Sequence, residues 1–300
     1  MIPQIELNNG LSIPVQGLGT YNIPEKSVEL AIRAAFEAGC SLLDTASAYG
    51  NEHLIGKAVQ SLTNKGVLSR NDLFIQTKVG DKIDEKGCPI GFYFYKSSSC
   101  PNQDTKKVVF EQVENSLKLL QTDYLDLVMI HWPYYDVLNE IWAALEDLYE
   151  QKVIKSIGVS NCKKRHIERI MKTAHVVPMV NQINVSPINT HEDDMKFFKE
   201  YNILVEAYSP MNVLQNKIFK TKHFDLFELA DKYGKTIQKV IMRCYYQKGI
   251  IPLPKSKTPA RIAQNYNIYD FDISQEDIAR LDAANFDFQY LTESLYCPGY

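Results

Sequence analysis

Four ionisable residues of complementary type stand at or near the ends of short apolar segments. They are Asp44 after SLL, Tyr49 five residues later, Lys78 after LFIQT and His131 after LDLVMI. An acid, a phenol, an amine and an imidazole held together can orient a reacting oxygen atom and pass a proton to it. Each residue alone has an ordinary explanation, such as a turn cap for Asp44 or a surface position for one of the 18 tyrosines. Their chemistry therefore depends on whether the fold brings the four together.

Segments of two kinds alternate along the chain, short apolar ones and longer ones with helical spacing. The predicted strands are Val15–Leu18, Ser41–Leu43, Leu73–Thr77, Leu125–Ile130, Ile154–Val159, Met179–Ile183, Leu204–Ala207 and Ile250–Leu253. The predicted helices are Glu25–Ala38, Glu52–Leu62, Thr105–Leu120, Val137–Gln151, Lys163–Lys172, Glu192–Tyr201, Asp225–Lys232, Thr236–Lys248 and Pro259–Tyr266. Ahead of them, Ile5–Leu7 and Leu11–Ile13 flank an Asn8-Asn9-Gly10 turn, which predicts an N-terminal hairpin.

Eight β/α units in strict alternation predict a parallel sheet, and eight within 300 residues favour a closed (β/α)8 barrel, the TIM-barrel fold. Strands such as LDLVMI are nearly continuous apolar runs, as in sheets that are covered on both faces. No Gly-, Ser- or Pro-rich linker divides the chain, so residues 1–300 are predicted to form one domain. Two segments interrupt the pattern: a long loop after strand 3, with consecutive aromatics at 92–95, and an aromatic C-terminal tail from Phe286.

The composition excludes several classes of protein. The chain is 45% hydrophobic with a net charge of −3, so it has material for a full core but no basic excess for nucleic acid or an anionic membrane surface. Its six cysteines have no CxxC spacing, so neither a disulfide framework nor a structural zinc site is expected. No apolar run is long enough to span a membrane and no signal peptide is expected, so the predicted location is cytoplasmic.

In a (β/α)8 barrel the active site forms where the strands end, and polar residues follow all eight predicted strands. The sequence there resembles the aldo-keto reductase superfamily, in particular its bacterial diketogluconate reductase-like branch. The segments that carry the resemblance are GLGTYNIP (17–24), LLDTASAYGNE (42–52), FIQTK (74–78), YLDLVMIHWP (124–133), KSIGVSN (155–161), NQI (181–183), EAYSP (206–210) and IPLPKSKTPARIAQN (251–265). The resemblance spans about residues 3–285 and implies a (β/α)8 reductase that uses NADPH.

The resemblance also implies that Asp44, Tyr49, Lys78 and His131 are catalytic. Tyr49 would give a proton to a carbonyl oxygen while a hydride reaches the carbonyl carbon. A free tyrosine has a pKa near ~10, which a cationic Lys78 would lower while a buried ion pair with Asp44 keeps the lysine charged. His131 would act as a neutral imidazole that donates to the carbonyl oxygen and orients it.

The chain has no GxGxxG fingerprint, and the resemblance implies a dinucleotide bound on the barrel itself. Ser160, Asn161 and Gln182 would bind the nicotinamide carboxamide, and Tyr208 would stack on the nicotinamide ring. A basic, hydroxyl-bearing segment would bind the 2′-phosphate and so favour NADPH over NADH; its residues are Lys255, Ser256, Thr258 and Arg261. The remaining expected cofactor contacts are Gly19, Thr20, Tyr21, Asp44, Ser209, Pro210, Met211, Gln264 and Asn265.

The expected substrate pocket contains Tyr21, Tyr49, His131 and Trp132, and its substrate would be a small carbonyl compound. Tyr21 stands where many members of the family carry tryptophan, Gln264 where an acidic residue commonly meets the adenine, and Met211-Asn212 where leucine and glycine are usual. The long loop, Gly80–Gln103, is expected to form part of the pocket wall, with packing on a neighbouring subunit as the alternative. The chain is expected to be a monomer or a weak homo-oligomer.

Two other functions are considered. Asp44 and His131 could be ligands of a metal-dependent hydrolase, but the other histidines (53, 166, 175, 191 and 223) fall away from the strand ends, so no metal is expected. The second alternative is a module on the same scaffold that senses the cofactor without catalysis. The complete set of four ionisable residues argues against it.

Overall fold

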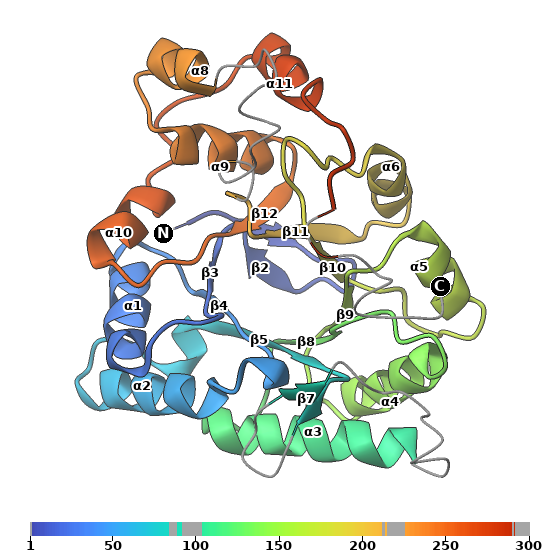
Figure 1. The fold of residues 1–300 in the computed structure, drawn as a ribbon. Coiled ribbons are helices and arrows are strands. Elements are labelled where there is room, and N and C mark those ends of the chain that lie inside the picture. The colour runs from blue at the N-terminus through green and yellow to red at the C-terminus, as the bar shows by residue number, and fades with distance from the viewer. Residues whose placement is uncertain are drawn as a thin grey trace.

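The computed structural model describes residues 2–83, 89–91, 104–211, 214, 226–289 and 291. Within them, eight parallel strands form one sheet in the order β12-β11-β10-β9-β8-β5-β4-β3, surrounded by helices (Figure 1). The strands are β3 (Gly17–Gly19), β4 (Leu42–Asp44), β5 (Phe74–Val79), β8 (Leu127–Ile130), β9 (Ile157–Ser160), β10 (Val180–Ile183), β11 (Leu204–Tyr208) and β12 (Ile250–Leu253). The first and last strands meet where the Gly19 amide donates to the Pro254 carbonyl, with an N–O distance of 3.1 Å. The predicted (β/α)8 barrel is confirmed, and a single domain over residues 1–300 stays a prediction.

The nine predicted helices are found within two residues of their predicted bounds, and the barrel strands within three. The helices of the described residues are α1 (Glu25–Glu37), α2 (Glu52–Asn64), α3 (Thr105–Leu120), α4 (Leu138–Glu150), α5 (Lys164–Met171), α6 (Glu192–Glu200), α8 (Leu226–Tyr233), α9 (Ile237–Gln247), α10 (Pro259–Tyr266) and α11 (Gln275–Asp282). Side chains cap the N-termini of several helices. At α11, for example, the Ser274 hydroxyl accepts a hydrogen bond from the Asp277 amide. The sequence did not predict α11, a short helix that buries only a few side chains.

The N-terminal hairpin pairs β1 (Gln4–Glu6) with β2 (Ser12–Pro14), as predicted. At its tip, the Asn8 and Asn9 amides donate to the carbonyls of Pro178 (3.2 Å) and Lys155 (3.1 Å). Those carbonyls precede β10 and β9, so the hairpin lies against the end of the barrel where the strands begin. The opposite end, where the strands finish, is left for the candidate site.

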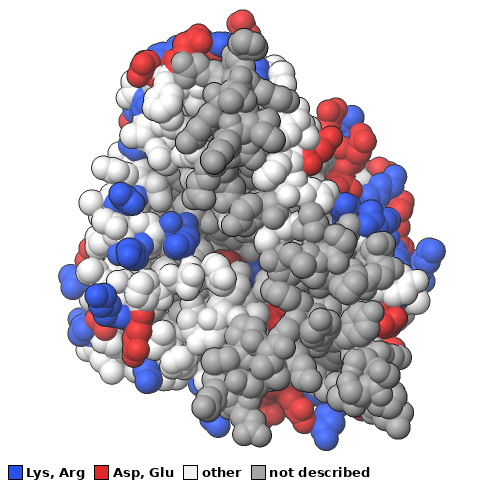
Figure 2. All heavy atoms as spheres, in the orientation of Figure 1, with Lys and Arg blue, Asp and Glu red and all other residues white. Residues whose placement is uncertain are grey.

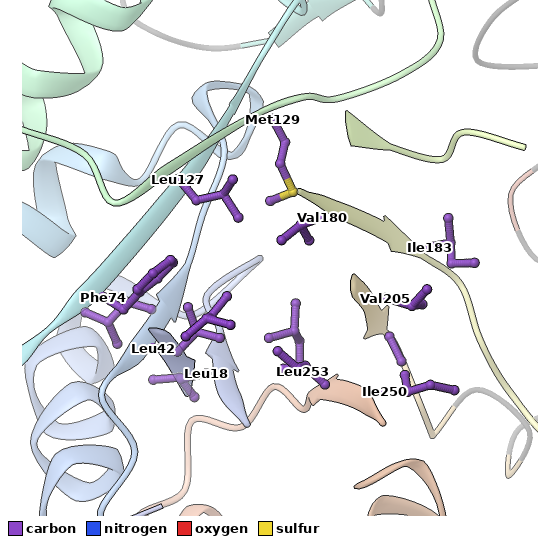
Figure 3. Close-up of a cluster of buried hydrophobic side chains, with 14 of the residues drawn as sticks. Leu18, Leu42, Phe74, Leu127, Met129, Val180, Ile183, Val205, Ile250 and Leu253 are labelled. Atoms are coloured by element: carbon purple, nitrogen blue, oxygen red, sulfur yellow. The ribbon is translucent and has the colours of Figure 1, made fainter. Parts of the chain in front are cut away.

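Buried apolar side chains of the strands and helices form one hydrophobic core, and Figure 3 shows the part of it that the strands contribute. Residues two apart on a strand face the same side, so Asp44 shares the face of Leu42, and Gln76 and Lys78 share the face of Phe74. The inward-facing side chains therefore change from apolar to polar toward the strand ends. Ionisable side chains therefore lie at the mouth of the barrel, and apolar side chains pack beneath them.

The long connection after β5 begins with a short antiparallel pair, β6 (Lys82–Ile83) and β7 (Pro89–Gly91). Both strands lie against η1 (Ser47–Tyr49), the 3-10 turn that carries Tyr49. The aromatic run at 92–95 lies outside the described residues, as do Cys88, Cys100, Cys297 and most of the C-terminal tail. In the part of the chain that the structure describes, no helix is long and apolar enough to cross a membrane.

Candidate active site

Lys78 and Asp44 form a buried ion pair inside the barrel. The Lys78 Nζ lies 2.6 Å from Asp44 Oδ1 and also donates to the Thr45 carbonyl at 2.9 Å. The Lys78 side chain is fully buried. Burial acts to lower the pKa of Lys78, but the charges of Asp44 and Tyr49 more than offset it and hold that pKa above its usual value. Lys78 is therefore a permanent cation, and Asp44 is its counter-ion.

A second acid, Glu206 of β11, lies behind this pair. The Nε2 atoms of Gln76 and Gln182 each donate both to Asp44 Oδ1 and to Glu206 Oε2, at distances of 2.7–2.9 Å. Asp44 Oδ1 thus accepts from three nitrogen donors, counting Lys78 Nζ. Burial and the nearby charge of Asp44 raise the pKa of Glu206 to about 7. The interior of the barrel therefore holds two acids bridged by two amides.

Tyr49 is held beside Lys78 by the short turn η1. The turn ends at Gly50, whose φ of 63° is in the left-handed region that suits glycine. The Ser47 hydroxyl ties the turn to β5 through the Lys78 carbonyl (2.9 Å), which leaves the Tyr49 hydroxyl 3.4 Å from Lys78 Nζ. Burial raises the pKa of Tyr49 to about 12, and the charge of Lys78 opposes this rise. The sequence predicted a lowered pKa; Lys78 does act in that direction, but burial has the larger effect.

The loop between β4 and α2 is fixed by side chains that sequence analysis assigned elsewhere or passed over. The Asn51 amide donates to the Thr20 carbonyl (2.9 Å) and its Oδ1 accepts from the Thr45 hydroxyl (2.9 Å). Thr20 is buried and its hydroxyl donates to the Asp44 carbonyl (2.8 Å). Thr20 was expected to contact the cofactor, and in the structure its hydroxyl supports the strand end that carries Asp44.

His131 follows β8 and is paired with an acid that the sequence did not single out, Asp81. The His131 Nδ1 contacts Asp81 Oδ2, and the other carboxylate oxygen accepts from the Tyr134 hydroxyl (2.9 Å). The His131 and Tyr49 rings lie edge to face with centroids 5.9 Å apart. All four predicted catalytic residues therefore converge on one place, together with Asp81 and Tyr134.

The expected pocket residues Tyr21 and Trp132 lie on two sides of this place. The Tyr21 ring is exposed and meets the Tyr49 ring with centroids 5.0 Å apart. Trp132 is buried, with its ring centroid 6.4 Å from that of His131. Trp132 also lines a pocket together with Asn161, Tyr208 and Leu291 of the C-terminal tail. The tail therefore approaches the candidate site.

The residues expected at the nicotinamide form one hydrogen-bond network across β9, β10 and β11. Asn161 donates to the His131 carbonyl (3.0 Å) and to the Ser160 hydroxyl (3.2 Å), and its Oδ1 accepts from the Tyr208 hydroxyl (2.8 Å). Gln182 accepts from the Ser160 hydroxyl through its backbone carbonyl (2.8 Å) and donates from its side chain to Asp44 Oδ1, so it joins this network to the acid pair. Asn161 has a φ of 58°, a left-handed conformation that asparagine adopts more readily than most residues.

Comparison with known proteins matches this architecture to one family. Residues 15–285 match the aldo/keto reductase family. The chain belongs to this family, and it is an oxidoreductase. It is 35% identical to the glyoxal reductase of Bacillus subtilis over 287 residues, which cover 94% of this chain and 93% of that protein. A methylglyoxal reductase of Escherichia coli is 33% identical over 283 residues, 93% of each chain.

Solved structures agree with the family assignment. An aldo-keto reductase of the silkworm Bombyx mori, crystallised in complex with NADP, superposes with a TM-score of 0.82. The two chains are 28% identical, and the superposition covers 99% of each. An aldo/keto reductase of Brucella melitensis is 32% identical, with a TM-score of 0.79 over 95% of this chain and all of the other.

The residues that the aldo/keto reductase resemblance assigned to the 2′-phosphate lie between β12 and the start of α10. Lys255, Thr258 and Arg261 are exposed, and no ion pair to a described carboxylate engages either cation. Figure 2 is drawn in the orientation of Figure 1. It shows several Lys and Arg side chains, in blue, in the region where Figure 1 places α10. The Ser256 hydroxyl accepts from the Thr258 amide (3.1 Å) and so shapes the turn into α10. Gln264 and Asn265 follow on the same helix.

Other expected cofactor contacts lie on both sides of the barrel closure. The Gly19 backbone lies against β12, where a Cβ atom would come within 3.3 Å of the Leu253 carbonyl. Ser209 is exposed with a φ of 48°, and Pro210 and Met211 follow it. Asn212 lies outside the described residues, so the end of this loop is not assigned.

Sequence analysis missed several residues with clear contacts in the site, among them Gln76, Asp81 and Glu206. Gln76 and Glu206 are polar residues inside strands, at inward-facing positions where an apolar residue is the norm, and that was the available signal. The two residues proposed as hydrolase ligands do not meet each other, because Asp44 binds Lys78 and His131 contacts Asp81. Among the described residues, no three His, Cys, Asp or Glu side chains lie close enough to hold a metal ion.

Proposed function

We propose that this aldo/keto reductase uses NADPH to reduce the carbonyl group of a small aldehyde or ketone, with Tyr49 as the general acid. The observation that carries the proposal is the position of Lys78 Nζ, 2.6 Å from Asp44 Oδ1 and 3.4 Å from the Tyr49 hydroxyl. A phenol beside a permanent cation can release its proton because the cation stabilises the phenolate that forms.

The chain's own residues divide the work of carbonyl reduction. Tyr49 is protonated at neutral pH and gives its proton to the substrate oxygen as negative charge develops there. Lys78 stabilises the resulting phenolate, and Asp44 keeps Lys78 in place through the short ion pair. His131 lies close enough to Tyr49 to bind the same oxygen. When bound, NADPH supplies the hydride that reaches the carbonyl carbon.

The network across β9–β11 fits a nicotinamide carboxamide. Gln182 Nε2 already binds the two acids, so Gln182 would offer its carbonyl oxygen to the cofactor. Asn161 Oδ1 accepts from the Tyr208 hydroxyl, and a carboxamide N–H could replace that hydroxyl. Lys255 and Arg261 would bind the 2′-phosphate from the turn into α10. The structure of the Bombyx mori relative in complex with NADP supports this choice of cofactor.

The names of the relatives suggest which carbonyl compounds to test first. One relative is a glyoxal reductase and another a methylglyoxal reductase, both of which are named for small dicarbonyl compounds. The contact of β6 and β7 with η1 supports a role for the Gly80–Gln103 connection in the wall of the substrate pocket. Removal of residues 84–103, which leaves Gly80 and Asp81 in place, is expected to change the relative rates on substrates of different size. Unchanged kinetics on all of them would contradict that role.

The proposal is tested by following the absorbance of the reduced nicotinamide, with NADPH and then NADH, over methylglyoxal, aromatic aldehydes and sugar ketones. We expect turnover that is faster with NADPH. Tyr49→Phe should lower kcat by roughly a hundredfold or more, since it removes the general acid, while NADPH binding survives. Full activity in this variant would show that the general acid is another residue.

The cofactor preference has its own test. Lys255→Ala should weaken NADPH binding far more than NADH binding, and equal weakening would remove the 2′-phosphate argument. Tight binding of NADPH without turnover on any carbonyl compound would instead favour a cofactor-sensing module.

A further inference from the structure

The contact between His131 and Asp81 determines which protons the imidazole can offer. Asp81 follows β5 and Gly80, and it is 1% exposed. Its Oδ2 contacts His131 Nδ1, and its Oδ1 accepts from the Tyr134 hydroxyl at 2.9 Å. The side chain of His131 keeps 11% of its surface exposed. A buried carboxylate therefore holds one side of the imidazole, while the ring keeps some access to the mouth of the barrel.

The segment that carries Asp81 is built to hold this position. Gln112 of α3 binds its backbone from both directions, accepting from the Gly80 amide (2.9 Å) and donating to the Asp81 carbonyl (2.8 Å). Gly80 has a φ of 107°, and a Cβ atom there would lie 2.3 Å from the Tyr134 ring. Glycine at position 80 is thus what allows Tyr134 to pack there and reach Asp81.

The hydrogen bonds at Asp81 decide where the shared proton lies. A carboxylate oxygen can only accept, so the group that faces Oδ2 must donate, and Nδ1 must carry a proton. In water a carboxylic acid gives up its proton more readily than an imidazolium does, so this shared proton belongs to the ring. An imidazole with one proton on Nδ1 has a bare Nε2, which accepts hydrogen bonds and cannot donate one to a carbonyl oxygen.

We infer that Asp81 is a positioning residue that fixes the proton on His131 Nδ1, so that His131 binds the substrate oxygen as a doubly protonated imidazolium. This differs from the neutral imidazole expected from the family resemblance. Asp81 supplies the negative charge that balances the imidazolium, as Asp44 does for Lys78. The proton on Nδ1 follows from the contact with Asp81, whereas the second proton, on Nε2, and the oxygen that it binds rest on the proposed function.

The charges around His131 permit this state. Among the described residues, the titratable groups that face it are Asp81, Tyr134 and Tyr49, with Lys78 behind Tyr49. The charge of Lys78 is balanced by Asp44, which lies 2.6 Å from it. The imidazolium is balanced by Asp81 in the same way. The site then presents two cations to a developing oxyanion, each with its own acid.

The proton positions can be read directly by NMR on protein labelled with 15N-histidine, with the His131 signals assigned from a His131→Gln variant. We expect a protonated Nδ1 in the absence of substrate, and two protonated ring nitrogens at the pH of maximal activity. Asp81→Leu removes the acceptor and should shift the proton of the neutral ring from Nδ1 to Nε2. An unprotonated Nδ1 in the wild type would overturn the inference, and this reading does not depend on any enzymatic activity.

Kinetics test whether Asp81 acts through His131. Asp81→Asn keeps the shape of the side chain and removes its charge, and we expect kcat to fall roughly a hundredfold, as for a lost acid–base contribution. In the His131→Gln background the same change should add little. An equal loss in both backgrounds would mean that Asp81 has only a structural role. Lys155→Met, far from the site, is the control and should leave kcat unchanged. If Asp81→Asn does not fold, kcat is measured instead in Tyr134→Phe, which removes one hydrogen bond from Asp81 and keeps its contact with His131.

Discussion

Two pairs, each of an acidic and a basic side chain and each with a tyrosine, lie at the mouth of the barrel. In the first, Asp44 binds Lys78 and Lys78 lies beside Tyr49. In the second, Asp81 binds both His131 and Tyr134. The first is built on the ends of two adjacent strands, β4 and β5, and its lysine is fully buried. The second joins the residue after β8 to a residue in the long connection after β5.

The two pairs differ in what their cation can do. A lysine held by a buried carboxylate stays charged throughout the pH range in which proteins are folded. An imidazole has two ring nitrogens, and the hydrogen bond made by one of them decides which tautomer it adopts. The first pair therefore provides a fixed charge for Tyr49, whereas the second sets which nitrogen of His131 carries a proton. Disruption of the first should cost both stability and activity, and disruption of the second mainly activity.

The largest effect is expected for Lys78→Met. The variant should lower kcat roughly 10²–10⁴-fold, because Tyr49 loses the cation that stabilises its phenolate. It should also lower the free energy of unfolding by about 3–5 kcal/mol, because Asp44 is left as an unpaired buried charge. Steady-state kinetics and urea unfolding measure the two effects. Lys155→Met is a matched control: its Nζ lies 3.3 Å from Asp126 Oδ1, it is partly exposed, and it should retain activity.

Gly80→Ala should disturb the second pair indirectly, by displacing the Tyr134 ring that binds Asp81. The added Cβ would lie 2.3 Å from the Tyr134 ring, and the φ of 107° is unfavourable for alanine. We expect a loss of about 2–4 kcal/mol in the free energy of unfolding, from backbone strain and overpacking. Because the ring can relieve the clash only by moving, kcat should fall as well. Gly66→Ala is the control, since it also has a positive φ (68°) but open space around it, and it should cost stability without lowering kcat.

Glu206 shares its two amide donors with Asp44 of the first pair, and its ionisation should make the stability of the protein depend on pH. Its pKa is about 7 in the folded protein and near the ordinary 4.5 in the unfolded chain. Between these values the unfolded chain releases a proton that the folded protein keeps, so stability falls as pH rises from 4.5 to 7, by roughly 3 kcal/mol in all. Glu206→Gln cannot ionise and should lose this part of the pH dependence.

Urea unfolding from pH 4.5 to pH 8 measures the effect in both proteins. The variant should gain stability relative to the wild type as pH rises across that range. A constant difference between the two proteins would mean that Glu206 does not titrate in the folded state.

The sequence predicted the first pair and not the second, for a physical reason. Asp44 and Lys78 end apolar strands, and an ionisable residue at such a position is visible because the strand pattern fixes where it points. Asp81 lies three residues after Lys78 in an irregular connection, where nothing in the periodicity fixes a side chain's direction. The Gln112 contacts and the space at Gly80 hold it in position beside His131, and these bring together segments more than 30 residues apart.

The same reasoning explains why the strands of the barrel were predicted and the polar contacts inside it were not. Alternation identified the strands and hence the barrel, because the apolar runs are long enough to be distinguished from helices. It treated Gln76 and Glu206 as members of those runs, because the hydrogen bonds of their side chains run to each other and to residues on other strands. Polar contacts across non-adjacent strands leave no local pattern in the sequence.

The smallest effect is expected for Tyr134→Phe, which removes one hydrogen bond from Asp81 and leaves the His131 contact in place. The loss of a hydrogen bond to a charged group predicts a decrease of about 1.5–3 kcal/mol in the free energy of unfolding. The phenyl ring still packs on Gly80, so kcat should fall by less than in Asp81→Asn. If the two variants lowered kcat equally, Tyr134 would share the role of Asp81, and the second pair would be a chain of three groups in which the tyrosine proton also matters.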